Sequence, residues 1–170
     1  LERNLEGYGR GVKALLSEAQ HKARMKGLVA DILDVPARYE AAIEAVLGER
    51  VQALLPDNLE STQQALAYLS DNEGRCTFLL PESPAADAPE MPGGTALVGL
   101  VKGRSGFQEV VSRLISGAYL VDDLTGYFTQ KLPFGVTLVT EDGNLLTHRG
   151  EVTGGGRQAL DQGLLHKKRE

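Results

Sequence analysis

Residues 136–156 read VTLVTEDGNLLTHRGEVTGGG, and this stretch decides the fold class. Residues 136–140 are rich in β-branched and apolar side chains, which is typical of a strand. The Asp-Gly pair in the turn at 141–144 supplies the positive φ values that a tight hairpin requires. Residues 145–149 are therefore predicted to form the returning strand. The glycine-rich end from Gly150 to Gly156 lets another backbone approach closely, because these positions carry few side chains.

Outward from this hairpin, short apolar runs alternate with segments whose apolar residues recur at helical spacing. Strands are predicted at 28–33, 51–55, 75–80, 96–101 and 119–121. Helices are predicted at 12–23, 36–47, 59–69 and 107–115, with a short one at 124–128. Asp57 or Asn58 is expected to cap the helix at 59–69. This alternation predicts an α/β (mixed α+β) protein in which short sheets are flanked by helices.

The clearest internal boundary lies at residues 81–94, which hold four of the seven prolines. Proline fixes φ and removes a backbone donor, so neither a helix nor a central strand persists there. We therefore expect one subdomain at residues 13–90 and a second at 91–156. Residues 1–12 and 157–170 have leucines at helical spacing among charged neighbours and are expected to be stubs of longer helices.

The composition indicates a globular protein and argues against a membrane-spanning one. An apolar content of 42% with 24% charged residues is ordinary for a globular protein, and the apolar runs are too short to span a bilayer. The N-terminus shows no secretory pattern, so a cytoplasmic location without membrane contact is expected. The single Cys76 cannot form an internal disulfide, and we interpret it as an inert strand residue.

The chain carries no phosphate-loop, nucleophile-elbow or zinc motif, so we expect neither an enzyme nor a metal or cofactor site. The loop from Gly150 to Gly156 leaves one alternative open, a small α/β ligand- or nucleotide-binding domain that holds an anion on backbone N–H groups. Asp122 and Asp123 could act as a carboxylate pair, although helix capping explains them more simply.

Two basic clusters stand out in a chain whose net charge is −5. They are formed by residues 21–26, including Lys22, Arg24 and Lys26, and by residues 166–169, including Lys167, Lys168 and Arg169. Such clusters can attract phosphate backbones through counterion release, or they can simply be solvated helix faces. The sequence leaves both interpretations open.

Several segments taken in order resemble the hinge domain of the structural maintenance of chromosomes (SMC) proteins, most closely the bacterial condensin type. The matching segments are Gly7-Tyr8 with 11–16, 27–29, 39–44 with Leu47-Gly48, 74–79, 121–124, 136–140 and 150–155. Their order and spacing cover nearly the whole chain. The resemblance implies a hinge of two small subdomains, each a short mixed sheet with flanking helices.

The resemblance further implies a homodimer in which the first subdomain of one copy meets the second subdomain of the other through strand edges and glycines. The glycines carried over as interface candidates are Gly103, Gly106, Gly150, Gly154 and Gly155. An unpaired sheet edge is satisfied by adding a partner strand, and glycine permits backbone contact.

In this family the chain enters from one coiled-coil arm and returns into an antiparallel one. The resemblance therefore implies a parent ATPase of chromosome condensation and segregation, with its heads and kleisin-type subunits far from this segment and a nucleoid location. It also implies weak, sequence-independent DNA contact near the coil junction. The candidates for that contact are Lys167, Lys168 and Arg169, with Lys22, Arg24 and Lys26.

Overall fold

The computed structural model describes residues 8–72, 74–81, 83, 87–155 and 165, which form two compact units. Unit 1 comprises the described residues of Leu1–Asp31 and Glu49–Pro84, and unit 2 those of Ile32–Gly48 and Ala85–Glu170. The division differs from the expected subdomains 13–90 and 91–156, because residues 32–48 belong to unit 2. Helix α4 (Glu40–Leu47) in this segment packs against β7 (Thr137–Val139) and α6 (Gln108–Ile115) of unit 2.

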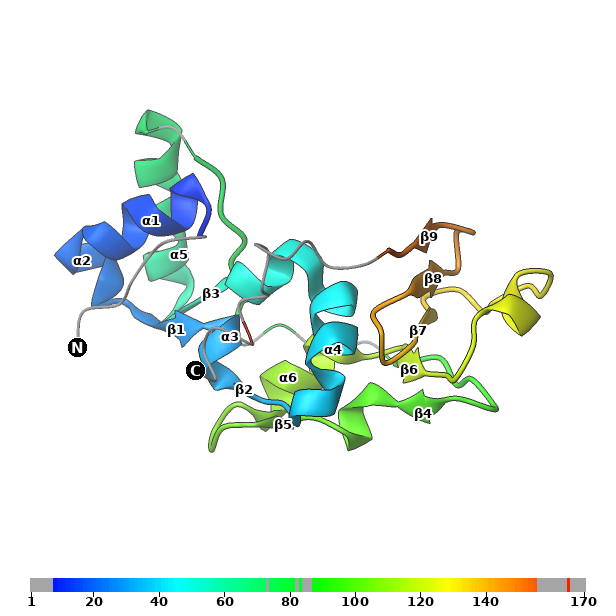
Figure 1. Cartoon of the computed structure of the whole chain (residues 1–170). Helices are drawn as coiled ribbons and strands as arrows, with labels where there is room; N and C mark the ends of the chain where they lie inside the picture. The colour runs from blue at the N-terminus through cyan, green and yellow to red at the C-terminus, as the bar shows by residue number, and fades with distance from the viewer. Residues whose placement is uncertain (1–7, 73, 82, 84–86, 156–164, 166–170) are drawn as a thin grey trace. The chain divides into compact units, whose positions relative to one another are not determined.

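Unit 1 combines helices with a two-stranded antiparallel sheet (Figure 1). In the sheet β1 (Met25–Leu28) pairs with β3 (Leu54–Pro56), which follows the 3-10 turn η2 (Gly48–Gln52). Helix α5 (Leu59–Asp71) packs against β3 and α1 (Arg10–Ser17). The buried core is formed by Val12, Leu15, Leu28, Leu54, Ala65 and Leu69. The side chain of Asn58 accepts a hydrogen bond from Ser61 N at 2.8 Å, so Asn58 is the residue that caps α5.

The predicted helix at 12–23 is not continuous. Glu18 adopts an extended conformation (φ −94°, ψ 114°), and this separates α1 from the short helix α2 (Ala19–Lys22). Val12 and Leu15 are buried as expected, whereas Ala19 and Ala23 are exposed. The apolar spacing beyond Glu18 therefore does not mark a buried face.

Helix α1 approaches the chain at residues 74 and 75 so closely that a side chain would not fit. A Cβ on Gly11 would lie 2.2 Å from the carbonyl oxygen of Arg75, and one on Gly74 would lie 2.8 Å from Gly11 Cα. Both neighbours are backbone atoms, which cannot rotate away. This crossing holds the extended segment that begins at Arg75 against the first turn of α1.

The predicted strand at 28–33 is wrong in its middle. Residues 29–32 form a helical turn, α3 (Val29–Ile32), between β1 and β2 (Leu33–Asp34), and Val29 N donates to Ala53 O at 2.8 Å. The side chain of Asp31 accepts from Leu28 N at 3.4 Å and supports the turn. Because most of this run is buried on all sides, hydrophobicity does not distinguish a strand from a helix here.

Unit 2 is built on a five-stranded mixed sheet of order β4-β6-β7-β8-β9 (Figure 1). The pairs are antiparallel except for the parallel pair of β6 with β7. The strands are β4 (Thr95–Ala96), β6 (Ala118–Leu120), β7, β8 (Leu145–Thr147) and β9 (Val152–Thr153), with 3-10 turns η3 (Leu97–Gly99) and η4 (Thr125–Tyr127) between them. The Asp-Gly hairpin is confirmed, since Gly143 has φ +90° and β7 pairs with β8.

A second, smaller sheet in unit 2 pairs β2 with β5 (Lys102–Gly103), and the 3-10 turn η1 (Ala37–Tyr39) leads into α4. Ile43 and Leu47 of α4 are buried, as are Val111 and Ile115 of α6. Gly117 follows α6 with φ +79°, and a Cβ there would lie 2.5 Å from the carbonyl oxygen of Gly135. This close approach lies where the parallel strands β6 and β7 begin.

Candidate functional site

Strand β9 lies at the edge of the unit 2 sheet, and no strand among the described residues pairs with its outer side. Leu145 pairs with Thr153 and Leu146 with Val152, and Thr147 N donates to Glu151 O at 3.0 Å. Backbone groups alternate along an antiparallel strand, so Glu151 and Thr153 face β8 while Val152 and Gly154 face outward. We call the outward N–H and C=O groups of Val152 and Gly154 the β9 edge. The side chain of Val152 is 56% exposed.

Unit 1 has a corresponding edge at residues 75–79. The predicted strand at 75–80 is reduced to one parallel bridge, in which Leu54 N donates to Thr77 O and Leu79 N donates to Leu54 O, both at 2.9 Å. Thr77 and Leu79 therefore face β3, and alternation turns the backbone groups of Cys76 and Phe78 outward. We call these outward groups the 75–79 edge.

Three of the five glycines predicted to lie at an interface flank β9. Gly150 (φ +81°) lies in the turn before the strand and Gly155 (φ +115°) just beyond it, so the fold of this chain alone favours glycine at both positions. A Cβ on Gly154 would lie 2.6 Å from Asn144 Oδ1. Replacing these glycines would therefore disturb the unit itself as well as any interface.

The other two interface candidates lie on different elements. Gly103 belongs to β5, where a Cβ would lie 2.9 Å from the Phe107 carbonyl oxygen, and the exposed Gly106 (φ +90°) precedes α6. Both positions have a local reason to be glycine. Their part in an interface stays a prediction.

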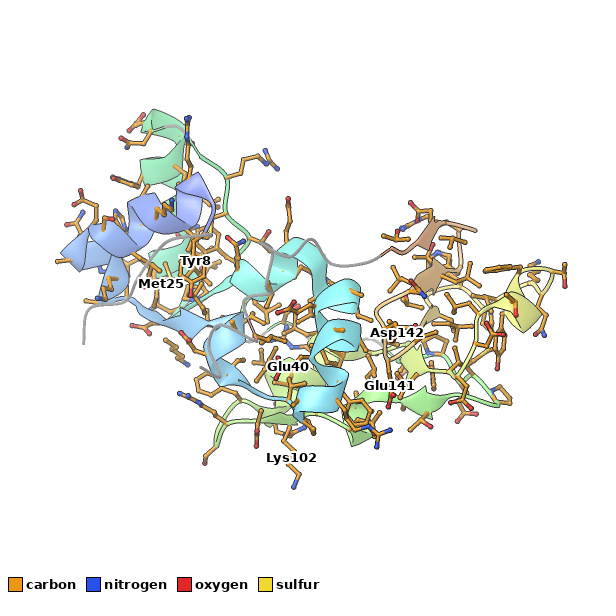
Figure 2. The ribbon with its side chains drawn as sticks, in the orientation of Figure 1. Tyr8, Met25, Glu40, Lys102, Glu141 and Asp142 are labelled. Carbon is orange, nitrogen blue, oxygen red and sulfur yellow. The ribbon has the colours of Figure 1, made fainter. Side chains whose placement is uncertain are left out.

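A groove of about 360 Å³ runs beside the β9 edge in unit 2. Asp122, Asp123 and Asp142 are exposed and line it, together with Phe128, Val152, Thr153 and Gly154. We call it the acidic groove; Figure 2 labels Asp142. The neighbouring Glu141 accepts a hydrogen bond from Arg38 Nε at 2.9 Å and is not part of the lining.

Asp123 serves the turn that follows it. Its carboxylate accepts hydrogen bonds from Thr125 Oγ1 at 2.6 Å and from Thr125 N at 3.1 Å, and these bonds lower the pKa of Asp123. Asp123 therefore supports this turn, but the N-cap position of η4 is Leu124, which has no side-chain cap hydrogen bond. Asp122 and Asp142 form no ion pair with another described residue, and both line the groove.

A second groove, of about 420 Å³, lies beside the 75–79 edge in unit 1. Arg10, Arg75 and Glu49 are its charged lining residues, and Cys76 and Thr77 bring the edge itself into the lining. We call it the basic groove. Burial raises the pKa of the Cys76 thiol to about 12, so this side chain stays protonated and unreactive at neutral pH, as the sequence indicated.

The basic clusters are only partly described. Lys22, Arg24 and Lys26 are exposed in unit 1, at the end of α2 and the start of β1. Lys167, Lys168 and Arg169 lie outside the described residues. Leu165 is buried, and its backbone N donates to Glu44 Oε1 of α4 at 2.6 Å.

No helix in the described part of the chain is long and apolar enough to cross a bilayer. The same residues contain no group of three or more His, Cys, Asp or Glu side chains that could hold a metal ion.

Neither the two grooves nor the two open edges were predicted from the sequence, because a two-residue strand such as β9 leaves almost no periodic signal.

Comparison with known proteins identifies the family. The model of the SMC proteins' flexible hinge domain matches residues 22–126. This chain belongs to the SMC hinge domain family. The hinge is 33% identical over 183 aligned residues to the chromosome partition protein Smc of Myxococcus xanthus, and 27% identical over 184 to that of Bacillus subtilis. Both alignments cover 100% of the hinge but only 15% of the relative.

Solved structures agree with this assignment. The hinge superposes with a TM-score of 0.78 and 27% identity on an asymmetric dimer of the Geobacillus stearothermophilus SMC hinge domain, covering 96% of this chain and 71% of that one. The Pyrococcus furiosus hinge domain shares the fold, with a TM-score of 0.71 at 22% identity over 94% of this chain and 88% of that one. The resemblance and the mixed α/β fold class are thus confirmed.

Proposed function

We propose that this hinge joins two copies of the chain by strand addition, the β9 edge of one copy pairing with the 75–79 edge of the other. The β9 edge lies in unit 2 and the 75–79 edge in unit 1, so two copies can form two equivalent contacts, each between unit 1 of one chain and unit 2 of the other. The observation that carries the proposal is the outward backbone of Val152 beside three flanking glycines. The asymmetric dimer formed by the Geobacillus stearothermophilus hinge supports self-association.

The wider role is part of the same proposal. The curated relatives are chromosome partition proteins, and this hinge spans 15% of their length. We infer that it links two coiled-coil arms of such a protein in the nucleoid. Catalysis by the ATPase heads and binding of kleisin-type subunits would then lie outside this segment.

The proposal is tested by replacing Val152 with proline. The variant loses the outward N–H, while the hydrogen bonds of Glu151 and Thr153 to β8 stay, and proline is tolerated at an edge strand. Loss of about 1.5 kcal/mol at each of two contacts is expected to weaken the dimer roughly 100-fold. Sedimentation equilibrium measures the dissociation constant, and the melting temperature shows whether the units stay folded.

Val152→Thr is the matched control, because it alters the side chain and keeps both the N–H and the β propensity. It is expected to dimerise within a few-fold of the parent. Phe78→Pro should reproduce the effect of Val152→Pro from the opposite edge. An unchanged dissociation constant in both proline variants would overturn the proposal, and a monomer that binds nucleotide would favour the alternative at Gly150–Gly156.

We also propose weak, salt-sensitive DNA contact by the two basic clusters, supported by the exposure of Lys22, Arg24 and Lys26 in a chain of net charge −5. Glutamate at Lys167, Lys168 and Arg169 is expected to abolish the retarded band in low-salt gels while the dimer persists. Glutamate at Lys22, Arg24 and Lys26 should weaken it. The control is Lys13→Glu, and unchanged retardation in both triple variants would refute the assignment.

A further inference from the structure

The two grooves carry opposite charge, and each adjoins one of the two edges. Three aspartates line the acidic groove, whose lining contains no cationic side chain. Two arginines and one glutamate line the basic groove, which leaves an excess of positive charge. Val152 and Gly154 belong to the acidic groove, and Cys76 and Thr77 to the basic one.

This placement connects the grooves to strand addition. Paired strands lie about 4.8 Å apart, so residues beside one edge come within side-chain reach of residues beside the other. Arg75 is exposed and directly precedes Cys76 in the 75–79 edge. An arginine side chain extended from this position can reach carboxylates across a paired β9 edge. Phe128, 51% exposed, offers an aromatic face for the guanidinium in the same groove.

We propose that the acidic groove of one copy receives the arginines of the basic groove of a second copy, and that this charge pairing selects which units meet. The inference rests on the proposed strand addition. Arg75 is the principal cation, and Asp122 and Asp142 are its carboxylate partners. Asp123 contributes charge from its place in the Thr125 turn. The pairing disfavours contact between two copies of unit 2, because two acidic grooves repel each other.

The test separates the two grooves by reversing their charge in different chains. One variant carries Arg10→Glu and Arg75→Glu, and the other carries Asp122→Lys and Asp142→Lys. In a homodimer of either variant both contacts bring like charges together, so we expect the dissociation constant to rise at least tenfold. An equimolar mixture restores opposite charges at both contacts. It should form heterodimers with an affinity near that of the parent.

Native mass spectrometry of the mixture distinguishes heterodimers from homodimers, and sedimentation measures the affinities. The control variant Lys13→Glu with Lys131→Glu makes the same change in net charge as the variant with Arg10→Glu and Arg75→Glu, at exposed positions outside both groove linings, and it should homodimerise normally. The charge pairing would be overturned if both reversed variants formed homodimers with the affinity of the parent, and if their mixture gave homodimers and heterodimers in statistical proportions. If Val152→Pro still abolished the dimer in that case, strand addition would stand without it. If Val152→Pro also had no effect, both would fall.

Discussion

Gly11→Ala is expected to lower the free energy of unfolding of unit 1 by about 3 kcal/mol. The new Cβ would lie 2.2 Å from the carbonyl oxygen of Arg75 and 2.5 Å from its carbonyl carbon. Because both atoms belong to the backbone, either helix α1 or the chain at 74–75 has to move. The helix also covers the core residues Val12 and Leu15, so a shift of α1 opens packing that is now complete.

The measurement is urea unfolding of the hinge, with hydrogen exchange to locate the loss of stability. Exchange should accelerate in α1 and in the 75–79 segment before it changes in unit 2. Gly9→Ala is the matched control, since its Cβ would lie 3.5 Å from Gln52 Oε1, an ordinary contact. If the Gly11→Ala variant were as stable as the Gly9→Ala variant, the backbone contact between Gly11 and Arg75 would not be as close as 2.2 Å implies.

The same substitution should weaken dimerisation, because Gly74 and Arg75 set the position from which the 75–79 edge begins. We expect the dissociation constant to rise together with the loss of exchange protection at 75–79. If exchange protection at 75–79 were lost while the dissociation constant stayed unchanged, the 75–79 edge would not be the partner of β9.

Gly117→Ala is expected to destabilise unit 2 by about 3 kcal/mol, from two causes. Alanine at φ +79° is strained by about 1–2 kcal/mol. The Cβ would also lie 2.5 Å from the Gly135 carbonyl oxygen, where β6 and β7 begin to pair. Thr137 N donates to Gly117 O at 2.9 Å, so relief of the contact would strain the first hydrogen bond of the parallel pair.

Differential scanning calorimetry and hydrogen exchange of β6 and β7 check this result. Gly126→Ala is the control in unit 2, because nothing lies within 4 Å of its Cβ and its φ is not positive. That variant should unfold within about 0.5 kcal/mol of the parent. Equal stability of the two alanine variants would contradict the close approach at Gly117.

The sequence predicted well those elements whose pattern is long or whose turn chemistry is distinctive. Helix α5 has a capping asparagine and thirteen residues of pattern, and the Asp-Gly hairpin has a glycine that needs positive φ. Both are confirmed. Local rules suffice there, because the deciding contacts lie within a few residues of one another.

The remaining features depend on contacts between distant residues. The run at 28–33 becomes β1, α3 and β2 because Val29 N bonds to Ala53 O and β2 pairs with β5, and no local pattern announces either contact. The outward backbone groups of the β9 edge and the 75–79 edge are decided by which residues pair with β8 and with β3, and the sequence does not reveal these pairings. Likewise, Asp142 and Asp122 are twenty positions apart, so their shared groove appears only after β6, β7 and β8 are paired.

The placement of residues 32–48 within unit 2 has a consequence for dissecting the protein genetically. The polypeptide leaves unit 1 after Asp31, contributes α4 to the other unit, and comes back at Glu49. A gene cut at the proline-rich segment would express a piece in which Ile43 and Leu47, both buried in the intact chain, have lost the surface they cover. The two units therefore have to be expressed together. Either half expressed alone is expected to aggregate through its exposed apolar residues and not to fold as an independent domain.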